Sequence, residues 1–572
     1  MKRNFKTPES IFSDITFDNY LIQYEGDIEQ EFEGLSDYYI TVINDRYAIL
    51  SLKKDIDIDT IRTTFPSIVY IKPTDAYTLQ DISPVDASQA IFLQLNLPLN
   101  LTGRGVNVAI IDTGIDYLSE EFMTLNGETR IQAIWDQTIP STNPEFNLDV
   151  PYGTIYTKEQ IQSAIQAYRD GKSPYEIVPS KDEIGHGTNM AGIIGGTGKN
   201  PDLRGVVPDC DFLVIKLIED YSFKAQFGID IPLYNITSIF VALEALYRYT
   251  LTNYKPLIIY FPLGTTFGNH DGNGILEQYI ETISKNSGVV VVTGTGNQRN
   301  NGIHTSGIIS RINETSVMDV DVSPEQKDLW LEIWINKPNI MSLDIVSPSG
   351  ENSGLINVLI NNTETYTFIF EKTSVRINYF LPEETTGDQL IRVRFYNIQP
   401  GIWKFRLTGN YILDGKYNAW LPQKGITMGD TSFSLSDPYG TITNPSNSSF
   451  LITAAAYNQN NNNIVNFSGM AFEENFVGVI DIAAGGINAL TVAPNNETAV
   501  VSGTSVSAAV AAGACAMLFE WGIVDGNDPY MYSQTLKTYI SRGTTKRPGD
   551  IYPNPQWGYG ILNILTMFQN MI

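Results

Sequence analysis

The sequence predicts an α/β protein with a doubly wound parallel sheet, a small α+β unit in front of it and a β-sandwich inserted into it. Short apolar runs alternate with helix-like segments along most of the chain, as they do where parallel strands are buried on both faces. From about residue 315 to 425, apolar and polar residues instead alternate one by one, which is typical of antiparallel strands. We therefore expect four consecutive segments, at residues 1–80, 81–314, 315–425 and 426–572.

The first 80 residues are expected to form a compact unit with the element order β-α-β-β-α-β. The runs Tyr38 to Val42 and Tyr47 to Leu52 flank the turn residues Asn44 and Asp45 and predict a hairpin. The other strands and helices are predicted at residues 20–24, 27–32, 58–64 and 68–71. This order is that of a split βαβ, or ferredoxin-like, fold.

The doubly wound sheet and the sandwich are predicted from separate sets of strands. The sheet takes the apolar runs at residues 106–112, 212–216, 256–260 and 288–293, with helices at 157–171 and 238–249 among the connections. The sandwich takes the alternating runs at residues 329–335, 366–370, 391–395 and 403–407. Gln399 to Gly401 is expected to make a tight turn that joins the last two strands as a hairpin.

Composition and charge exclude several classes of partner. Asp and Glu total 63 against 37 Lys and Arg, giving a net charge of -26 without a basic tract, so nucleic acid and anionic membranes would be repelled. With only Cys210 and Cys515, no disulfide framework is expected. Pro8, Glu9 and Asp14 interrupt the N-terminal segment before an apolar stretch of signal-peptide length, and we expect neither a secretory signal nor a transmembrane span.

Two motifs combine a glycine turn with a side chain that can bear catalysis. Asp112 ends an apolar strand and is followed by Gly114, at the sheet edge where α/β proteins place ligands. His186 lies between two glycines at the start of an expected helix, where its ring can face a cleft. An aspartate at a strand end is more often a cap or turn residue, so this motif alone is weak. The other histidines, His270 and His304, lie in loop-like stretches and are expected at the surface.

A third motif places Ser505 after Gly503 and Thr504, at the start of a helix of small residues. Free N–H groups and the dipole at a helix N-terminus can stabilise an oxyanion, although a serine there is also a common N-cap. The three side chains occur in the order Asp, His, Ser, which is the order of the subtilisin triad. Their joint occurrence is the strongest functional signal in the sequence.

By these motifs, DTGID, GHGT-x-x-AG and the GTS that opens the small-residue helix, the chain resembles the subtilisin-like serine proteases (subtilases, S8 family). The resemblance implies that Asn297 and the backbone N–H of Ser505 donate hydrogen bonds to an oxyanion. It also implies that the segment Pro262, Leu263 and Gly264 walls the primary specificity pocket. The sequence departs from the family at Ala508 and Ala509, where a proline is usual, and we expect altered helix packing there rather than lost chemistry.

Three additions to the core narrow the resemblance to the Csp proteases of clostridial spores. They are the long stretch between Asp112 and His186, the α+β unit, which is a prodomain in that family, and the inserted sandwich, which is a jelly roll there. The likeness is closest around Ser83–Ala87 and Gly264–Asp271. It implies a germination enzyme of the bacterial spore whose substrate is the zymogen of a cortex-degrading hydrolase. Some Csp members have lost triad residues and act as sensors, whereas this sequence keeps all three.

No cofactor or metal ion is expected. Subtilases often bind calcium in the loop after the histidine helix, but Gly198 to Asp202 offers a lysine and one carboxylate, a poor set for a hard cation.

In the sandwich, we expect the aliphatic face of residues 329–335 to fill the core. The opposite face, with Trp330 and Trp334, would pack on the protease domain and stiffen it rather than bind substrate.

The leading interpretation is an endopeptidase in which His186 deprotonates Ser505 and Asp112 holds the imidazole in place. Two alternatives stay open: a silent, sensor-like pseudoprotease whose prodomain never leaves the cleft, and a secreted nutritional protease, which the expected lack of a signal peptide disfavours. In the leading interpretation the prodomain is cut by the enzyme itself and remains as an inhibitor. Pro84 would end pairing with the cleft, so we expect cleavage at Gln80–Asp81 within a few residues.

Overall fold

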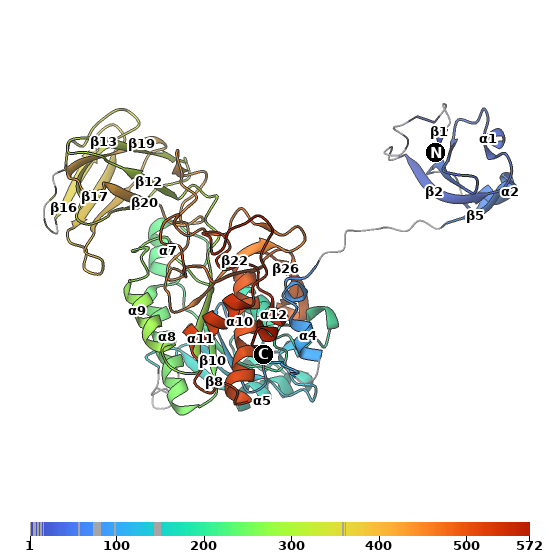
Figure 1. The fold of residues 1–572 in the computed structure, drawn as a ribbon, viewed down its shortest axis with the longest axis horizontal. Helices are drawn as coiled ribbons and strands as arrows, with labels where there is room; N and C mark the ends of the chain where they lie inside the picture. The colour runs from blue at the N-terminus through green and yellow to red at the C-terminus, as the bar shows by residue number, and fades with distance from the viewer. Residues whose placement is uncertain are drawn as a thin grey trace. The chain divides into compact units, whose positions relative to one another are not determined.

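The computed structural model describes residues 2–3, 7–8, 11, 14, 16–54, 56, 58–72, 82–95, 99–141, 150–356, 358, 360 and 362–571. Within it the chain forms two compact units, Met1–Gln80 and Asp81–Ile572 (Figure 1). The predicted cleavage bond between Gln80 and Asp81 lies outside the described residues.

From β2 to β5 the first unit has the predicted order β-α-β-β-α-β, and a short strand, β1, which was not predicted, precedes it. Its antiparallel sheet has the order β1-β3-β4-β2-β5. Phe32 and Phe65, which follow the two helices, stack at 4.1 Å between ring centroids over a core that includes Ile22 and Leu50. The bounds are β1 (Lys2–Arg3), β2 (Phe17–Tyr24), α1 (Ile28–Glu31), β3 (Tyr38–Val42), β4 (Tyr47–Lys53), α2 (Ile61–Thr64) and β5 (Ile68–Ile71).

The second unit is built on a sheet of the order β23-β22-β11-β10-β6-β9-β7-β8, with β24 also paired to β22. The strands from β22 to β7 are parallel, whereas β23 and β8 at the edges are antiparallel. The bounds are β6 (Asn107–Asp112), β7 (Ile131–Asp136), β8 (Thr154–Thr157), β9 (Asp211–Lys216), β10 (Leu257–Tyr260), β11 (Val289–Gly294), β22 (Ile452–Asn458), β23 (Asn463–Ile464) and β24 (Ile482–Gly485).

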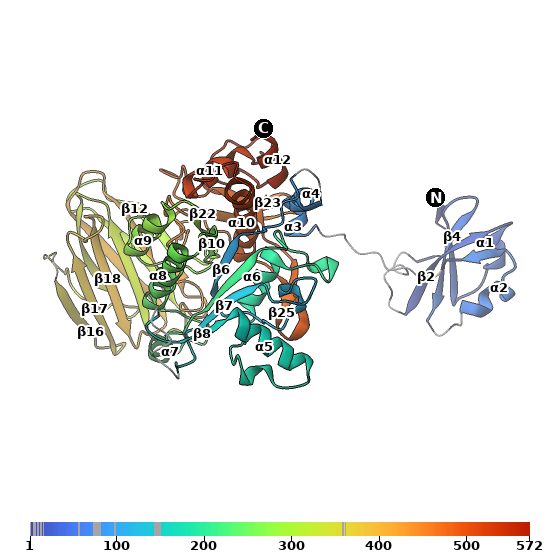
Figure 2. The same ribbon diagram turned by 90° about the horizontal axis from the view of Figure 1, so that it is seen from below.

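Helices cover both faces of this sheet, as the apolar runs predict (Figure 2). One face packs on α8 (Ile236–Thr252) and α9 (Ile275–Ser284). The other packs on α4 (Ala90–Leu95), α5 (Lys158–Arg169), α6 (His186–Gly195), α10 (Thr504–Phe519), α11 (Ser533–Arg542) and α12 (Ile564–Gln569). The remaining elements are α3 (Pro84–Ala87), α7 (Tyr221–Phe227) and a hairpin of β25 (Ala489–Ala493) and β26 (Glu497–Val501).

Helix α10 is the central helix of the second unit. Within the part of the chain that the structure describes, only the helical run Thr504–Val524 is long and apolar enough to cross a membrane, and 89% of its most apolar window is buried inside the protein. A helix that is apolar on all sides is expected in the middle of a core. Ala508 and Ala509, where the family usually has a proline, are both fully buried in this helix.

The inserted region folds as two antiparallel sheets around a shared apolar core. Their orders are β12-β20-β14-β18-β17-β16 and β15-β19-β13-β21, and the strands begin before residue 315 and end after 425. The bounds are β12 (His304–Ile308), β13 (Thr315–Val322), β14 (Leu329–Ile335), β15 (Ile340–Val346), β16 (Thr363–Phe368), β17 (Thr373–Phe380), β18 (Gln389–Tyr396), β19 (Gly401–Tyr411), β20 (Lys416–Trp420) and β21 (Ser432–Phe433).

The predicted hairpin around Gln399 to Gly401 is wrong. Strand β18 pairs with β14 and β17, whereas β19 pairs with β13 and β15, so the turn carries the chain from one sheet to the other. The apolar residues of the two strands then face each other across the core. Phe395 lies 5.1 Å from Trp403 and 5.8 Å from Phe405 between ring centroids. Alternation predicts a strand with one buried face, but it does not identify the strand's partner.

The sandwich contacts the main sheet's domain through aromatic side chains. Trp330 of β14 packs edge-on against Phe223 and Phe227 of α7, at 5.2 and 5.0 Å between ring centroids. Glu332, the next residue on the same face, accepts a hydrogen bond from the backbone N–H of Gly268 at 3.0 Å. These contacts place the predicted Trp330 face against the protease-like domain.

His270 and His304 are not surface residues, contrary to the prediction. His270 stacks on Trp420 with ring centroids 3.9 Å apart. His304, which is itself buried, also stacks on Trp420, with ring centroids 4.7 Å apart. Burial lowers the pKa of His270 to about 3 and also lowers the pKa of His304. Both histidines are therefore neutral components of the junction between the sandwich and the main domain, a role that a loop-like sequence cannot reveal.

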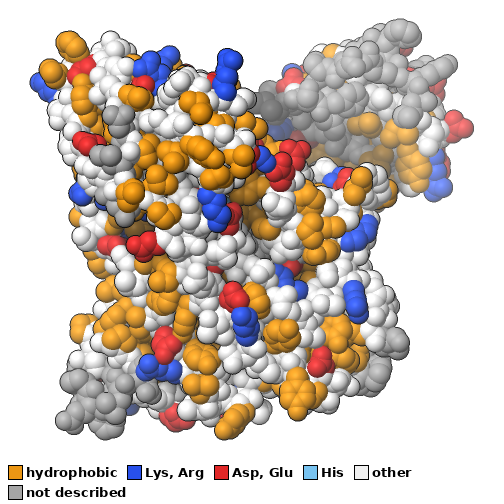
Figure 3. All heavy atoms as spheres, turned by 60° about the vertical axis from the view of Figure 1, so that its left-hand side comes forward, with side chains coloured by type: hydrophobic (Ala, Val, Ile, Leu, Met, Phe, Trp, Pro, Cys, Tyr) orange, Lys and Arg blue, Asp and Glu red, His pale blue; other side chains and the backbone are white. Residues whose placement is uncertain are grey.

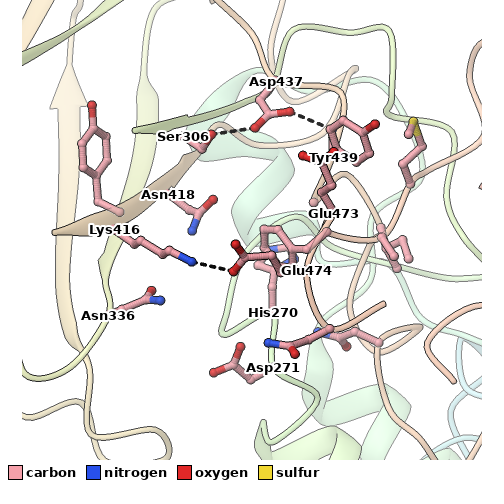
Figure 4. Close-up of a pocket in the computed structure, with 18 of the residues that line it drawn as sticks. His270, Asp271, Ser306, Asn336, Lys416, Asn418, Asp437, Tyr439, Glu473 and Glu474 are labelled. Atoms are coloured by element: carbon pink, nitrogen blue, oxygen red, sulfur yellow. Dashed lines mark hydrogen bonds and ion pairs between the residues drawn. The ribbon is translucent and has the colours of Figure 1, made fainter. Parts of the chain in front are cut away.

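The same junction contains polar contacts and a cavity of about 590 Å³. Figure 4 shows Lys416 paired with Glu474 and Ser306 bonded to Asp437 across it, at 2.5 and 2.6 Å. His270 and Asp271 line this cavity, whereas Asp112, His186 and Ser505 do not.

Basic and acidic side chains are interspersed on the face of the molecule shown in Figure 3, and apolar side chains are scattered among them. This face offers no continuous basic surface to a polyanion.

Candidate active site

Strand β6 and helix α6 bring Asp112 and His186 into contact. His186 Nδ1 lies 2.8 Å from Oδ2 and 2.9 Å from Oδ1 of Asp112, whose carboxylate is buried at the end of the central strand. A carboxylate only accepts hydrogen bonds, so Nδ1 must carry the proton. Nε2 of the neutral ring is therefore a free base.

The environment of His186 favours its protonated form. Burial by itself lowers the pKa of the imidazole, but the charge and hydrogen bond of Asp112, with a further contribution from the charge of Asp182, outweigh it and raise the pKa. The ring keeps 38% of its side-chain surface exposed, so a substrate can reach it.

Ser505 lies in the first turn of α10, as the third motif predicts. The helix starts after Gly503, whose φ of 152° is rarely adopted by other residues, so the chain can turn sharply into the helix. The carbonyl oxygen of Ser505 accepts a hydrogen bond from Tyr260 Oη at 2.9 Å. In the described residues Ser505 Oγ makes no hydrogen bond to His186, and such catalytic bonds are often long before substrate binds.

Asn297 lies beside the start of α10. Its Oδ1 accepts a hydrogen bond from the backbone N–H of Thr504 at 3.0 Å, and this contact fixes which end of the amide is the oxygen. A Cβ atom built on Gly503 would lie 3.6 Å from Asn297 Nδ2 and 3.8 Å from the Ser505 nitrogen. The two nitrogens therefore lie in the same region, next to Ser505.

A cavity of about 140 Å³ joins these residues to the predicted pocket wall. Pro262, Leu263 and Gly264 line it together with Asn297 and Ser505, so the structure gathers this part of the prediction in one place. Its other lining residues are Gly294, Gly296, Gln298, Thr443 and Thr504. None of these side chains is charged.

Thr443 closes the cavity at Gly264 and Gly296. A Cβ on either glycine would overlap the Thr443 side chain, which is buried. Thr443 belongs to a loop beyond the sandwich, and no motif marks it.

Asp182, by contrast, precedes the histidine helix by only a few residues. A carboxylate in that position is a recognisable signal for the start of a helix, although the motifs above do not include it.

The loop after α6 does not fit a calcium ion. Three of its backbone N–H groups, at Gly198, Lys199 and Asn200, donate to the buried carboxylate of Glu121 at 2.7, 3.2 and 2.7 Å. The guanidinium of Arg130 binds the carbonyl oxygen of Gly195 at the end of α6. The loop thus presents donors and a fixed cation rather than oxygen ligands. Among the described residues, no group of three or more His, Cys, Asp or Glu side chains could hold a metal ion.

The doubly wound sheet, with a carboxylate–imidazole pair at one strand end and a serine at the start of the central helix, is the arrangement of the subtilases. The chain belongs to this family: the model of the subtilase family matches residues 103–326 and 429–560, and most of the sandwich lies in the unmatched stretch between them.

Among solved structures, the chain is similar to the CspB protease of Clostridium perfringens, with 27% identity and a TM-score of 0.74 over 85% of this chain and 97% of that chain. The chain is thus a subtilisin-like protein of the Csp type, as its sequence predicts. Sphericase matches 85% of this chain and 99% of its own with 14% identity and a TM-score of 0.43. No curated protein matches the chain.

Proposed function

We propose that the protein is a serine endopeptidase in which Asp112, His186 and Ser505 act together. The observation that carries this proposal is the bond of His186 Nδ1 to both oxygens of Asp112, in a fold that places Ser505 in the first turn of its central helix. With Nδ1 bonded to Asp112, the other ring nitrogen, Nε2, is available to accept a proton and later return it.

In the proposed reaction, Ser505 Oγ attacks the carbonyl carbon of the scissile peptide while its proton passes to His186 Nε2. The Oγ–C bond forms, and the carbonyl π electrons move onto oxygen. When this intermediate collapses, the C–N bond breaks and His186 gives its proton to the leaving amine. Water then repeats the two steps on the acyl-enzyme, which releases the acid and restores the serine.

Asn297 and the Ser505 N–H are proposed to bind the oxyanion. Asn297 Oδ1 is engaged by Thr504, so Nδ2 is the end of this amide that can donate to the substrate. Donors that are fixed before reaction stabilise the developing charge without reorganising, which is why they contribute to the rate.

The cavity next to these donors is proposed to receive the side chain on the acyl side of the scissile bond. Its lining is uncharged, and the Thr443 side chain lies against Gly264 and Gly296 in its wall. A lysine, arginine or carboxylate would lose hydration there without gaining an ion pair. A neutral side chain such as that of Gln80, the residue before the expected self-cleavage bond, would not incur this cost.

We further propose that the protein acts in the bacterial spore, where it would activate the zymogen of a cortex-degrading hydrolase during germination. Support comes from the resemblance to the clostridial Csp proteases and from the likeness to the Clostridium perfringens CspB protease over nearly the whole of that chain. Residues 1–80 would be its prodomain, first a folding template and then an inhibitor. Their separation as a compact unit supports this assignment.

A fluorophosphonate probe tests the proposed chemistry, because it labels only an activated serine. We expect the purified protein to be labelled and to cleave peptides, and the Ser505→Ala variant to be folded and to do neither. Ser507→Ala is the matched control, because Ser507 lies on the same helix and bonds to the Ala484 carbonyl at 3.0 Å inside the core. Failure of the wild-type protein to react, even after residues 1–80 are removed, would favour the sensor-like alternative.

A further inference from the structure

Asp182 is a buried carboxylate that receives four hydrogen bonds at the start of the histidine helix. Its Oδ1 accepts from the Gly185 N–H and from Thr113 Oγ1, both at 2.8 Å. Its Oδ2 accepts from the Thr188 N–H at 2.9 Å and from Thr188 Oγ1 at 2.7 Å. Only 5% of the residue's surface is exposed, so these four donors satisfy the carboxylate within the protein.

These bonds connect the two segments that carry Asp112 and His186. Thr113 directly follows Asp112, to whose Oδ1 its N–H donates at 2.7 Å. Thr113 Oγ1 donates to Asp182 and accepts from the Gly187 N–H at 3.0 Å, immediately after His186. A closed set of hydrogen bonds therefore runs from the carboxylate of Asp112 through Thr113 and Asp182 to the first turn of α6.

The start of α6 requires such an acceptor. The N-cap is Gly185, which has a φ of 89° and no side chain that could accept from the first turn. The first N–H groups of a helix need partners, and the dipole favours an anion at this end. Asp182 and Thr113 supply the acceptors from outside the helix.

We infer that Asp182 is a positioning residue for His186: it holds the first turn of α6 in register with Asp112, and its negative charge stabilises the imidazolium that forms in each turnover. The inference rests on the proposed function. It assigns to Asp182 a role in orientation and electrostatics without contact to substrate.

The charged groups around His186 support this role. Asp112 and Asp182 are the two carboxylates whose charges raise the pKa of the imidazole. Tyr234 faces the same carboxylates, and burial, followed by the charge of Asp112, raises its pKa, so it stays neutral. Nearby, Glu183 is paired with Lys216 at 2.6 Å.

A second carboxylate lies on the far side of Asp182. Asp116, three residues beyond Thr113, accepts a hydrogen bond from the Asn495 N–H at 2.8 Å. Burial raises the pKa of Asp116, and the charge of Asp182 adds to this effect.

The test compares Asp182→Asn with Asp136→Asn. Asp136 is a matched control, because it is also fully buried and accepts from Ser180 Oγ and from the N–H and Oγ1 of Thr138, yet its charge does not contribute to the pKa of His186. We expect Asp182→Asn to lower kcat ~10- to 100-fold with little change in KM, because a misplaced base impairs chemistry rather than binding. The acid limb of the pH dependence of kcat should move to lower pH in this variant, since the loss of a negative charge lowers the pKa of His186.

A titration without turnover separates this inference from the proposed function. The chain has three histidines, and the pKa values of His270 and His304 are lowered, so a [13C]histidine-labelled Ser505→Ala protein should show one resonance that titrates at raised pH. Asp182→Asn should move that titration to lower pH, and Asp136→Asn should not. An unchanged titration would overturn the inference even if the wild-type protein is an active protease. If Asp182→Asn shifts the titration but the wild-type protein has no protease activity, the result would instead count against the proposed function alone.

Thr113→Val tests the positioning role by a route that preserves side-chain shape and charge. It removes the bonds to Asp182 and Gly187 but leaves the carboxylate in place. We expect kcat to fall several-fold while the acid limb stays where it is in the wild-type enzyme. If Asp182→Asn does not fold, a wild-type kcat in Thr113→Val refutes the inference by itself.

Discussion

The side-chain amide of Asn297 is oriented by a hydrogen bond at its oxygen. The Thr504 N–H can only donate, so the oxygen of the Asn297 amide must face it, and Nδ2 then lies in the same region as the Ser505 nitrogen. The donor is set before any substrate binds. This is the condition under which a hydrogen bond lowers an activation barrier rather than only improving affinity.

We predict that Asn297→Ala lowers kcat on a peptide substrate ~10²- to 10³-fold with little change in KM, because one oxyanion donor is lost. Steady-state kinetics provides the measurement. Gln298→Ala is the control: Gln298 lines the same cavity, but its Oε1 accepts from Asn301 and from the Lys424 N–H. Equal losses in both variants would mean that the cavity, and not the donor, is what matters.

At the residue scale, the sequence predicts the position of a residue when that position is determined by neighbouring residues in the chain, and not when it is determined by contacts distant in sequence. Asp112, His186 and Ser505 each have a local reason, a strand end or a helix start, and the motifs identify them. Thr443 closes the cavity only because a loop beyond the sandwich folds back onto Gly264, and no local pattern reports that contact. The prediction that His270 and His304 lie at the surface is wrong for the same reason, because both stack on Trp420, which belongs to a strand of the sandwich.

At the scale of elements, the sandwich contacts the main domain through two aromatic clusters, around Trp330 and Trp420, and through several polar contacts. Trp330 contacts Phe223 and Phe227, and Arg394 lies over its ring at 4.5 Å. Alternation along 329–335 correctly separates the face that fills the sandwich from the face that packs outward. The helix that receives Trp330, α7, could not be predicted, because its apolar residues carry no information about which surface they meet.

We predict that Trp330→Ala destabilises the protein by about 3 kcal/mol, the lower end of the usual cost for a large aromatic residue, because Trp330 is only partly buried. The Tm should fall by a few degrees, and limited proteolysis should release fragments of the sandwich sooner. Phe370→Ala, which removes an aromatic side chain 77% exposed on the same sandwich, should change neither. Unchanged stability together with loss of cleavage of a protein substrate would assign this face to recognition.

At the scale of the whole molecule, the chain separates a first unit from the domain that carries the site. The boundary between the compact units falls between residues 80 and 81, and the sequence analysis expects cleavage at the same bond. The last strand of the first unit ends at Ile71, and the first helix of the second unit, α3, begins at Pro84, so the boundary falls in the connection between them. The bond itself could not be derived from pattern alone, because cleavage depends on which residue the cavity accepts.

The proposed self-processing would link the boundary to the site, so an assay for it tests both together. If the cavity beside Ser505 receives Gln80, the wild-type protein should appear as a fragment of about 80 residues and a remainder that begins at Asp81, bound to one another. Ser505→Ala should remain full-length by mass spectrometry and N-terminal sequencing. Clipping of Ser505→Ala at this bond, with no other protease present, would rule out this serine as the agent.

The isosteric change Gln80→Glu tests the match between residue and cavity. No charged side chain lines the cavity, so a carboxylate at this position would be desolvated without a partner. We therefore expect slower processing or a shift to a neighbouring bond. Gln89→Glu, on the other side of Pro84, controls for added charge. Wild-type processing at residue 80 in Gln80→Glu would show that the side chain before the cut does not enter this cavity, whichever residues perform the chemistry.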